Sequence, residues 1–297
     1  MRTEDEMYEL ILNIAKQDES IRAVYMNGSR TNPNVPRDIF QDYDVVYVVT
    51  DTKPYREDKA WINQFGERLY MQYPDEHPDY PSDTEIFYGW LMQFRDGNRI
   101  DLHVESISHA KENILNDKLC KILLDKDNLL PAIPESTDED YRVKEPSKEQ
   151  YLCTCNEFWW CLNNVAKGLW RQEIPYAQDM LNFNVRKQLE KMLSWKIGVE
   201  NDFSVSVGKS AKYMYRWLSE EEWKTYLSTY AAGTVEECWS AIFRMCDLFE
   251  TVAIYVGEKL GYCYNVEEAK GGRRFLEYVR ELPQDATDME EIKRWKS

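Results

Sequence analysis

The sequence has no long apolar segment. No uncharged apolar run approaches the roughly 18 residues that a membrane-spanning helix requires. The residues that follow Met1 are mostly polar, unlike those of a secretory signal. We therefore expect a cytoplasmic protein with no membrane partner.

Positive charge is also scarce. Lys and Arg total 37 against 53 Asp and Glu, which gives a net charge of −16 at pH 7. Such a chain repels nucleic acid and anionic membrane, and it suits a cationic or metal-bridged ligand. The excess is spread along the chain, so most of it is expected to be an ordinary solvated surface, and no nucleic-acid partner is expected.

The cysteines fit neither a disulfide framework nor a zinc site. The seven cysteines are an odd number without a secretory signal, which favours reduced, buried thiols. Cys153, Cys155 and Cys161 cluster, but no histidine lies near them. On a helix the first two would point about 200° apart, so we do not expect them to bind zinc.

The first part of the chain alternates between helical and strand patterns. Apolar residues at helical spacing predict helices over residues 4–17, 59–70 and 111–125. Strands are predicted over residues 21–28 and 42–50, and two more lie within residues 86–106, joined by a tight turn at Asp96-Gly97.

Residues 131–150 separate two parts of different character. This stretch combines three prolines with dense charge and no periodicity, which is typical of a linker. A chain of 297 residues has room for about two domains, and we place them at residues 1–135 and 136–297. The predicted fold class is α+β, with a mixed sheet and flanking helices followed by a helical bundle.

Capping boxes support the helical interpretation of the second part. Three such motifs mark predicted helix starts: Ser147 with Gln150, Ser219 with Glu222, and Thr234 with Glu237. Tryptophans and phenylalanines at spacings of three to four are expected to form the core of the bundle rather than a platform for nucleic-acid bases.

Two aspartates one residue apart begin the apolar strand VVYVV. On a strand, residues i and i+2 share a face, so Asp42 and Asp44 direct two carboxylates toward one point. Two like charges held this close are costly unless a cation lies between them. Mg²⁺ is usually held by one or two carboxylates together with substrate phosphates, so we predict a Mg²⁺ site at this strand end.

The neighbouring motifs point to phosphate chemistry. Gly28 lets backbone approach a ligand closely, and Ser29 with the following N–H groups can hydrogen-bond phosphate oxygens. Asp101 lies in another predicted strand, with His103 on the same face. If that strand lies next to the strand of Asp42 and Asp44, three aspartates converge on one or two metal ions, as in enzymes that catalyse in-line displacement at phosphorus. His103 is expected to be a neutral side chain buried against the sheet.

Each of these motifs also has a structural explanation. A Gly-Ser pair is common in turns, a D-x-D pair occurs by chance where a loop meets a strand, and Asp101 could be a solubilising charge after its turn. Their combination, in this order and at predicted strand ends, is considerably more specific.

With these motifs the sequence resembles the bacterial aminoglycoside 6-adenylyltransferases that modify streptomycin, within the nucleotidyltransferase superfamily. The resemblance begins at Gly28-Ser29, DYD and IDL. It continues through CNEFWW, VAKGLWR, SWKIG and GKSAKYM, and so spans nearly the whole chain. Asn27 and His103 depart from the family, in which an acidic residue and a hydroxyl residue can occur at these positions.

The resemblance implies an N-terminal nucleotidyltransferase domain, a helical substrate-binding domain, and Mg²⁺ and ATP bound in the cleft between them. The residues implied to hold the triphosphate are Gly28, Ser29 and Arg30, and those implied to hold the metal are Asp42, Asp44 and Asp101. A hydroxyl of a cationic aminoglycoside would attack the α-phosphorus of ATP, and pyrophosphate would leave.

Two lysines of the second domain are further candidates for the triphosphate. Lys209 and Lys212 are the candidates, and the alternative is two exposed lysines at a helix start. Gly208-Lys209-Ser210 does not form a P-loop, because Phe203 stands where that motif requires its first glycine.

A carboxylate of the second domain is the predicted general base. We predict Asp179 from its place in a segment that resembles the family's, with Glu85, Glu157 and Glu173 as the rivals. Trp170 and Tyr176 are predicted to pack against sugar or guanidinium groups of the substrate, where cation–π contact is available. The alternative for both aromatic residues is a place in the core.

Three other functions stay open at this point. Nucleotide transfer to a protein or tRNA keeps the same site, although the lack of a basic stripe argues against tRNA. A D-x-D glycosyltransferase would need a larger nucleotide-binding region before Asp42, and it would leave Gly28-Ser29 without a role. A non-catalytic binding protein is disfavoured by the three intact aspartates.

Overall fold

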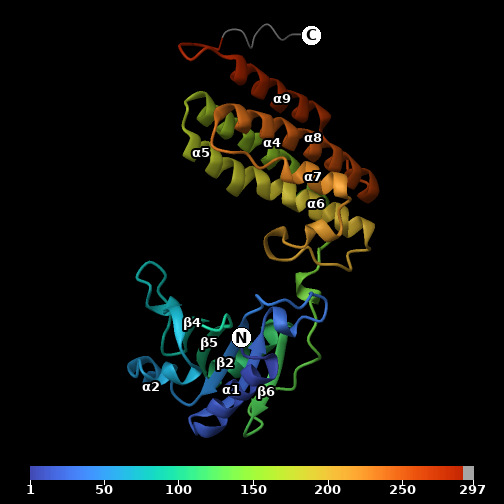
Figure 1. The fold of residues 1–297 in the computed structure, drawn as a ribbon. Helices are drawn as coiled ribbons and strands as arrows, with labels where there is room; N and C mark the ends of the chain where they lie inside the picture. The colour runs from blue at the N-terminus through green and yellow to red at the C-terminus, as the bar shows by residue number, and fades with distance from the viewer. Residues whose placement is uncertain (290–297) are drawn as a thin grey trace. The chain divides into compact units, whose positions relative to one another are not determined.

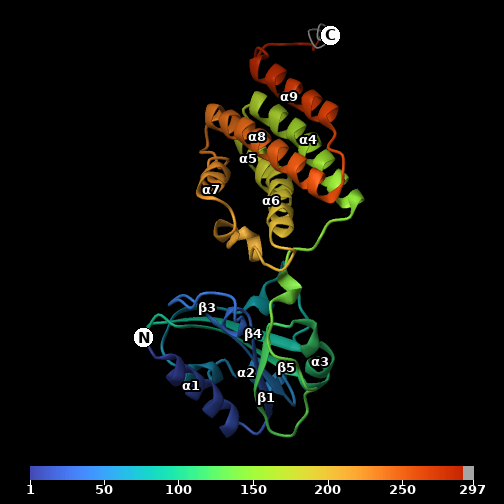
Figure 2. The same ribbon diagram turned by 90° about the vertical axis from the view of Figure 1, so that its right-hand side faces the viewer.

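The computed structural model describes residues 1–289 (Figures 1 and 2), and the chain divides into two compact units, Met1–Asp140 and Tyr141–Ser297. Residues 126–138 contain neither helix nor strand, and the expected boundary after residue 135 falls in this segment. No helix in the described part of the chain combines the length and the apolarity that crossing a membrane requires.

The first unit is built on a six-stranded sheet in the order β3-β4-β5-β2-β1-β6. The strands are β1 (Ile21–Asn27), β2 (Tyr43–Val49), β3 (Arg68–Gln72), β4 (Phe87–Phe94), β5 (Arg99–Ser106) and β6 (Cys120–Asp125). Strands β2 and β5 are parallel, and every other neighbouring pair is antiparallel. The sheet is therefore mixed, as the predicted fold class requires.

Helices cover the two faces of this sheet unequally (Figure 2). Helix α1 (Glu4–Gln17) and helix α2 (Lys53–Glu57) pack with the larger apolar cluster, on the face that holds Val45 and Tyr47 of β2. Helix α3 (Ile107–Asn113) belongs to the smaller cluster on the opposite face. Strand β2 is buried on both faces, which explains its continuous apolar run.

Two of the helices predicted in this unit are wrong. In place of the helix over residues 59–70, the chain forms a short 3-10 turn, Trp61–Phe65, and then enters strand β3 at Arg68. The turn ends at Gly66 because that residue has φ 113°. In residues 111–125 the helix stops at Asn113, and Cys120–Asp125 forms strand β6 along the free edge of β1. The hairpin of β4 and β5 does turn at Asp96-Gly97, with Gly97 at φ 92°.

The second unit is helical, as expected. Its helices are α4 (Lys148–Trp170), α5 (Ile174–Asp179), α6 (Arg186–Glu200), α7 (Glu220–Leu227), α8 (Val235–Leu260) and α9 (Val266–Glu281), and a π-helical turn, Met180–Val185, joins α5 to α6. One apolar cluster runs through them, and Phe158 of α4 stacks on Phe249 of α8 with ring centroids 3.7 Å apart. These helices therefore share a single core.

Local sequence signals start these helices. Ser147 and Ser219 form complete capping boxes, in which the hydroxyl accepts from the backbone N–H three residues on and the side chain there accepts from the cap's own N–H. Thr234 caps α8 through its hydroxyl alone. Two of the three predicted boxes are therefore complete, and the third is half formed.

Candidate active site

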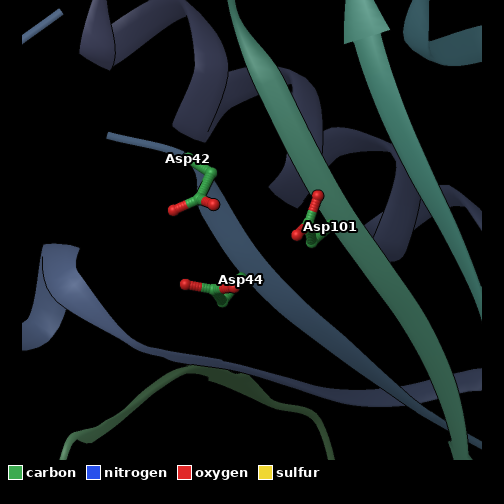
Figure 3. A group of neighbouring side chains, drawn as sticks. All are labelled: Asp42, Asp44 and Asp101. Carbon is green, nitrogen blue, oxygen red and sulfur yellow. The ribbon is translucent and has the colours of Figure 1, made fainter. Parts of the chain in front are cut away.

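Three aspartates converge at one end of the sheet (Figure 3). The parallel register of β2 and β5 places Asp44 directly beside Asp101, and Asp42 precedes β2 by one residue. One carboxylate oxygen from each residue lies within 4.8 Å of the other two. The expectation that Asp101 lies on the strand next to Asp42 and Asp44 is confirmed.

The Asp44 carboxyl group lies half-buried beside the other two carboxylates. Burial, followed by the charges of Asp42 and Asp101, raises the pKa of Asp44 to about 7, and the Arg99 guanidinium opposes the rise. A divalent cation would relieve this repulsion, and carboxylate oxygens are the ligands that Mg²⁺ prefers. The three aspartates therefore fit Mg²⁺ in both charge and ligand type.

A turn that only glycine can form lies against the same carboxylate. Gly28 follows β1 with φ 77° and ψ −155°, a conformation that side chains essentially forbid. A Cβ atom there would lie 2.0 Å from Asp44 Oδ2. Ser29 begins the 3-10 turn Ser29–Thr31, and the Thr31 hydroxyl donates to the Gly28 carbonyl at 2.9 Å. The Gly28-Ser29 backbone is thus held beside the carboxylate cluster.

Asn27 completes this corner of the site. It is the last residue of β1 and pairs with Asp44 of β2 in the antiparallel register. Its Oδ1 atom is buried and has no hydrogen-bond partner within residues 1–289. A buried acceptor of this kind normally has a partner, so it adds an unmet oxygen to the three carboxylates.

The Arg30 side chain contacts backbone carbonyls and an aromatic ring of the protein, and it is not free beside the carboxylate cluster. Its side chain is buried, and the guanidinium donates to the carbonyls of Asp42 at 3.0 Å and Gln41 at 2.8 Å. It also lies 3.6 Å above the centre of the Tyr43 ring. These contacts fix the segment that delivers Asp42 and favour a positioning role. The prediction that Arg30 binds ATP stays a prediction.

Arg99 is a site residue that the sequence analysis missed. Its Nε and Nη2 donate to the two carboxylate oxygens of Asp101 at 2.8 Å and 2.6 Å, and Nε lies 3.8 Å from Asp42 Oδ2. Arg99 precedes Asp101 by two residues on β5, so the two side chains share a face of the sheet. The two-residue spacing between Arg99 and Asp101 in the sequence could have identified Arg99 as a neighbour of the aspartates.

Behind the aspartates, the same face of β5 carries His103 and Glu105. The His103 ring stacks on Phe87 with ring centroids 4.3 Å apart, and burial lowers its pKa, which favours the neutral form. Glu105 is 2% exposed, accepts a hydrogen bond from the Tyr25 hydroxyl and contacts Nδ1 of His109. The sequence analysis did not single out Glu105, although it continues the alternation that starts at Asp101.

The substrate residues predicted in the second unit lie at its surface or in its core. Asp179 is exposed at the end of α5, where the π-helical turn begins, and Tyr176 is 41% exposed on the same helix. The Trp170 indole N–H donates to the Leu282 carbonyl at 3.1 Å, which ties α4 to the end of α9. That contact favours the core alternative for Trp170.

The two candidate lysines lie in the segment between α6 and α7. Lys209 begins a 3-10 turn directly after Gly208, and the ammonium of Lys212 lies 5.0 Å from the centre of the Tyr213 ring. Both side chains are exposed. The roles assigned to Asp179, Tyr176, Trp170 and the two lysines stay predictions.

Comparison with known proteins identifies relatives along nearly the whole chain. The family described as streptomycin adenylyltransferase matches residues 1–279. An aminoglycoside 6-adenylyltransferase of Bacillus subtilis (strain 168) is 40% identical over 265 residues, which cover 89% of this chain and 93% of that protein. One from Campylobacter jejuni is 40% identical over 270 residues, which cover 91% of this chain and 93% of that protein.

Among solved structures, the crystal structure of an aminoglycoside 6-adenyltransferase from Bacillus subtilis is 34% identical in sequence. The match covers 95% of this chain and 100% of that chain, with a TM-score of 0.48.

Proposed function

Because this chain belongs to the streptomycin adenylyltransferase family, we propose that it transfers AMP from ATP to an aminoglycoside hydroxyl, with the 6-position of streptomycin as the acceptor. Pyrophosphate would be the leaving group, and the antibiotic would be inactivated. The relatives from Bacillus subtilis and Campylobacter jejuni are named aminoglycoside 6-adenylyltransferases, which supports AMP transfer to an aminoglycoside.

The carboxylate cluster is the observation that carries this proposal. Asp42, Asp44 and Asp101 gather their oxygens within 4.8 Å at the end of a rigid sheet, and the Gly28 turn lies against them. A polyphosphate needs a cation and backbone donors side by side, because its charge must be both neutralised and oriented. This end of the sheet supplies residues suited to both tasks.

Mg²⁺ would be held by the three aspartates, and when bound it would supply positive charge to the phosphoryl oxygens as charge develops on them. The Gly28-Ser29 backbone would orient the triphosphate. Arg99 would add a fixed positive charge beside Asp101, within the same cluster. These residues hold and orient the nucleotide, so that the attacking hydroxyl meets the α-phosphorus in line with the departing oxygen.

The acceptor needs a general base, for which Asp179 is the proposed residue. It is exposed at the start of the π-helical turn, an irregularity that often occurs at functional sites. The net charge of −16 also favours a polycationic acceptor, because long-range attraction raises the local concentration of a cation.

Mass spectrometry of the antibiotic tests the proposal directly. Purified protein is incubated with Mg²⁺, ATP and streptomycin, and the drug is then weighed. We expect a mass gain of one adenylyl group, and no gain with the Asp44→Asn variant. An unmodified drug, from protein that binds ATP with Mg²⁺, would contradict the proposed acceptor and direct the search to other aminoglycosides and then to other hydroxyl compounds.

A further inference from the structure

An aromatic ring is exposed on the segment that leads into the carboxylate cluster. Phe40 is 85% exposed, more than any other large apolar side chain in residues 1–289. It stands two residues before Asp42, so the Cα atoms of these two residues are at most about 7 Å apart. Single apolar residues are common at protein surfaces, so exposure alone assigns no role to this ring. Its place beside the cluster is the feature that points to a function.

Hydrogen bonds fix the backbone around Phe40. Its N–H donates to Asp38 Oδ1 at 2.7 Å, and the Gln41 N–H donates to the Asp38 carbonyl at 3.5 Å, which closes a tight turn. The Arg30 guanidinium then donates to the Gln41 carbonyl at 2.8 Å, and Gln41 Nε2 donates to the Ser29 carbonyl at 3.4 Å. The turn that carries Phe40 is therefore tied to the backbone that lies against the carboxylates.

The residues on either side of Phe40 face away from the carboxylates. Ile39, Gln41 and Tyr43 all line one hollow of about 310 Å³ beside the start of α1, and Phe40 is not part of that lining. Side chains alternate along an extended chain, so Asp42 points to the opposite side, where the carboxylates converge. The same alternation places the Phe40 ring on the side of the carboxylates.

The position of this ring suits the base of a nucleotide. The carboxylate cluster and the Gly28-Ser29 turn would hold the metal and the triphosphate, which leaves the base to be bound by other residues. A base has a flat π-face, and an exposed aromatic side chain offers it a surface for stacking. The base is joined to the α-phosphate through one ribose, so it must lie about one sugar away from the metal ligands. Phe40 stands within such reach of Asp42.

We propose that Phe40 is a nucleotide-binding residue, on which the purine ring of ATP stacks. The inference rests on the proposed function, since it concerns the nucleotide of the same reaction. Stacking depends on the flat face of a base and little on its substituents. Phe40 would therefore contribute equally to the binding of any purine nucleoside triphosphate, and it would contribute nothing to the binding of a polyphosphate that lacks a base.

A comparison of a nucleotide with a bare polyphosphate tests this inference. Isothermal titration in the presence of Mg²⁺ measures the affinity of wild type and Phe40→Ala for a non-hydrolysable ATP analogue and for inorganic tripolyphosphate. We expect Phe40→Ala to bind the ATP analogue about tenfold more weakly, as for the loss of one stacking contact, and to bind tripolyphosphate as wild type does. The affinity for a GTP analogue should fall by the same factor.

Two further substitutions separate stacking from general apolar contact. Phe40→Trp keeps an aromatic face and should bind the ATP analogue at least as tightly as wild type. Phe40→Leu keeps an apolar side chain without a ring, so it should bind the analogue nearly as weakly as Phe40→Ala. Ile39→Ala is the matched control, because Ile39 lies in the same turn and is 66% exposed but lines the hollow beside α1. Its affinity for the analogue should stay within about twofold of wild type.

The titrations distinguish failure of the inference from failure of the proposed function. An unchanged affinity of Phe40→Ala for the ATP analogue would overturn the inference and leave the proposed function standing. Equal losses for the ATP analogue and for tripolyphosphate would also overturn it, because the effect would then pass through the segment that carries Asp42. A wild type that binds no ATP analogue in the presence of Mg²⁺ would overturn the proposed function and the inference together.

Discussion

The two units of the chain place their polar side chains in contrasting ways. In the second unit, the buried Arg186 guanidinium is fully engaged, because it donates to Asn182 and to both oxygens of Thr229. In the first unit, three carboxylates crowd one end of the sheet, and the pKa of Asp44 rises to about 7. Unrelieved repulsion of this kind costs stability, and such costs are typical of functional sites. This contrast supports the proposal that the metal and nucleotide site lies in the first unit.

The largest expected effect comes from neutralising the aspartates. Asp42→Asn, Asp44→Asn and Asp101→Asn should each lower the rate of AMP transfer by about a thousandfold or more, because each removes a charge on which the phosphoryl site depends. Steady-state rates measure this, and circular dichroism checks that the fold is intact.

Asp51 provides the control for these variants. It is an exposed aspartate that follows the opposite end of β2, so Asp51→Asn should keep activity within about twofold of wild type. Normal turnover by both Asp42→Asn and Asp44→Asn would break the comparison between the units.

The next effect concerns the backbone beside the cluster. Gly28→Ala would place a Cβ atom 2.0 Å from Asp44 Oδ2, so the carboxylate must move, and we expect activity to fall by about a hundredfold. Gly97→Ala is the matched control, because Gly97 also has positive φ, at 92°, and its Cβ would have no atom closer than 3.9 Å. It should lose stability by about 1 kcal/mol or more but keep activity. Equal loss of activity in both variants would attribute the Gly28 effect to backbone strain alone.

Asp44 also predicts a dependence of stability on pH. Because its pKa is about 7 in the folded unit, the folded state holds this proton more tightly than the unfolded state between about pH 4 and pH 7. Asp44 therefore lowers the free energy of unfolding as the pH rises through that window. Asp44→Asn should raise the melting temperature by about 5 °C at pH 8 without Mg²⁺, and by nearly nothing at pH 4. An equal gain at both pH values would contradict this account.

The smallest expected effect comes from a substitution in the second unit. Ser147→Ala removes the capping box at the start of α4 and should cost about 1 kcal/mol of stability. Denaturant unfolding measures that loss. Binding of Mg²⁺ and ATP to the first unit should not change, and a large loss of nucleotide affinity would show that the proposed site depends on this helix end.

The sequence predicted most of what depends on short-range chemistry. Helix α1 forms over the predicted residues 4–17, since Thr3 and Glu6 make a capping box at its start. The pair Asp42 and Asp44 was predicted as a site because side chains two residues apart on a strand point to the same face. The Gly97 turn was recognised because Asp-Gly favours the backbone that joins two antiparallel strands.

One of the two wrong helices, over residues 111–125, fails where a distant segment decides the structure. Residues 120–125 have an apolar pattern that suits either helix or strand, and pairing with β1 decides between them. Asp101 lies beside Asp44 because β2 and β5 pair in parallel register. The sequence suggested that these two strands are neighbours but could not determine it. Glu105 contacts Tyr25 of β1 and His109 of α3. Because these partners come from another strand and from a helix, the burial of Glu105 was not evident from the residues next to it in the sequence.

Manganese binding tests the central claim, that the three aspartates form the metal and nucleotide site. Mn²⁺ can replace Mg²⁺ at oxygen ligands, and its electron paramagnetic resonance signal reports the bound fraction. With a non-hydrolysable ATP analogue, wild type and Asp51→Asn should bind Mn²⁺ equally, whereas Asp42→Asn and Asp101→Asn should each bind it at least about tenfold more weakly. Equal Mn²⁺ binding by all four proteins would contradict the account.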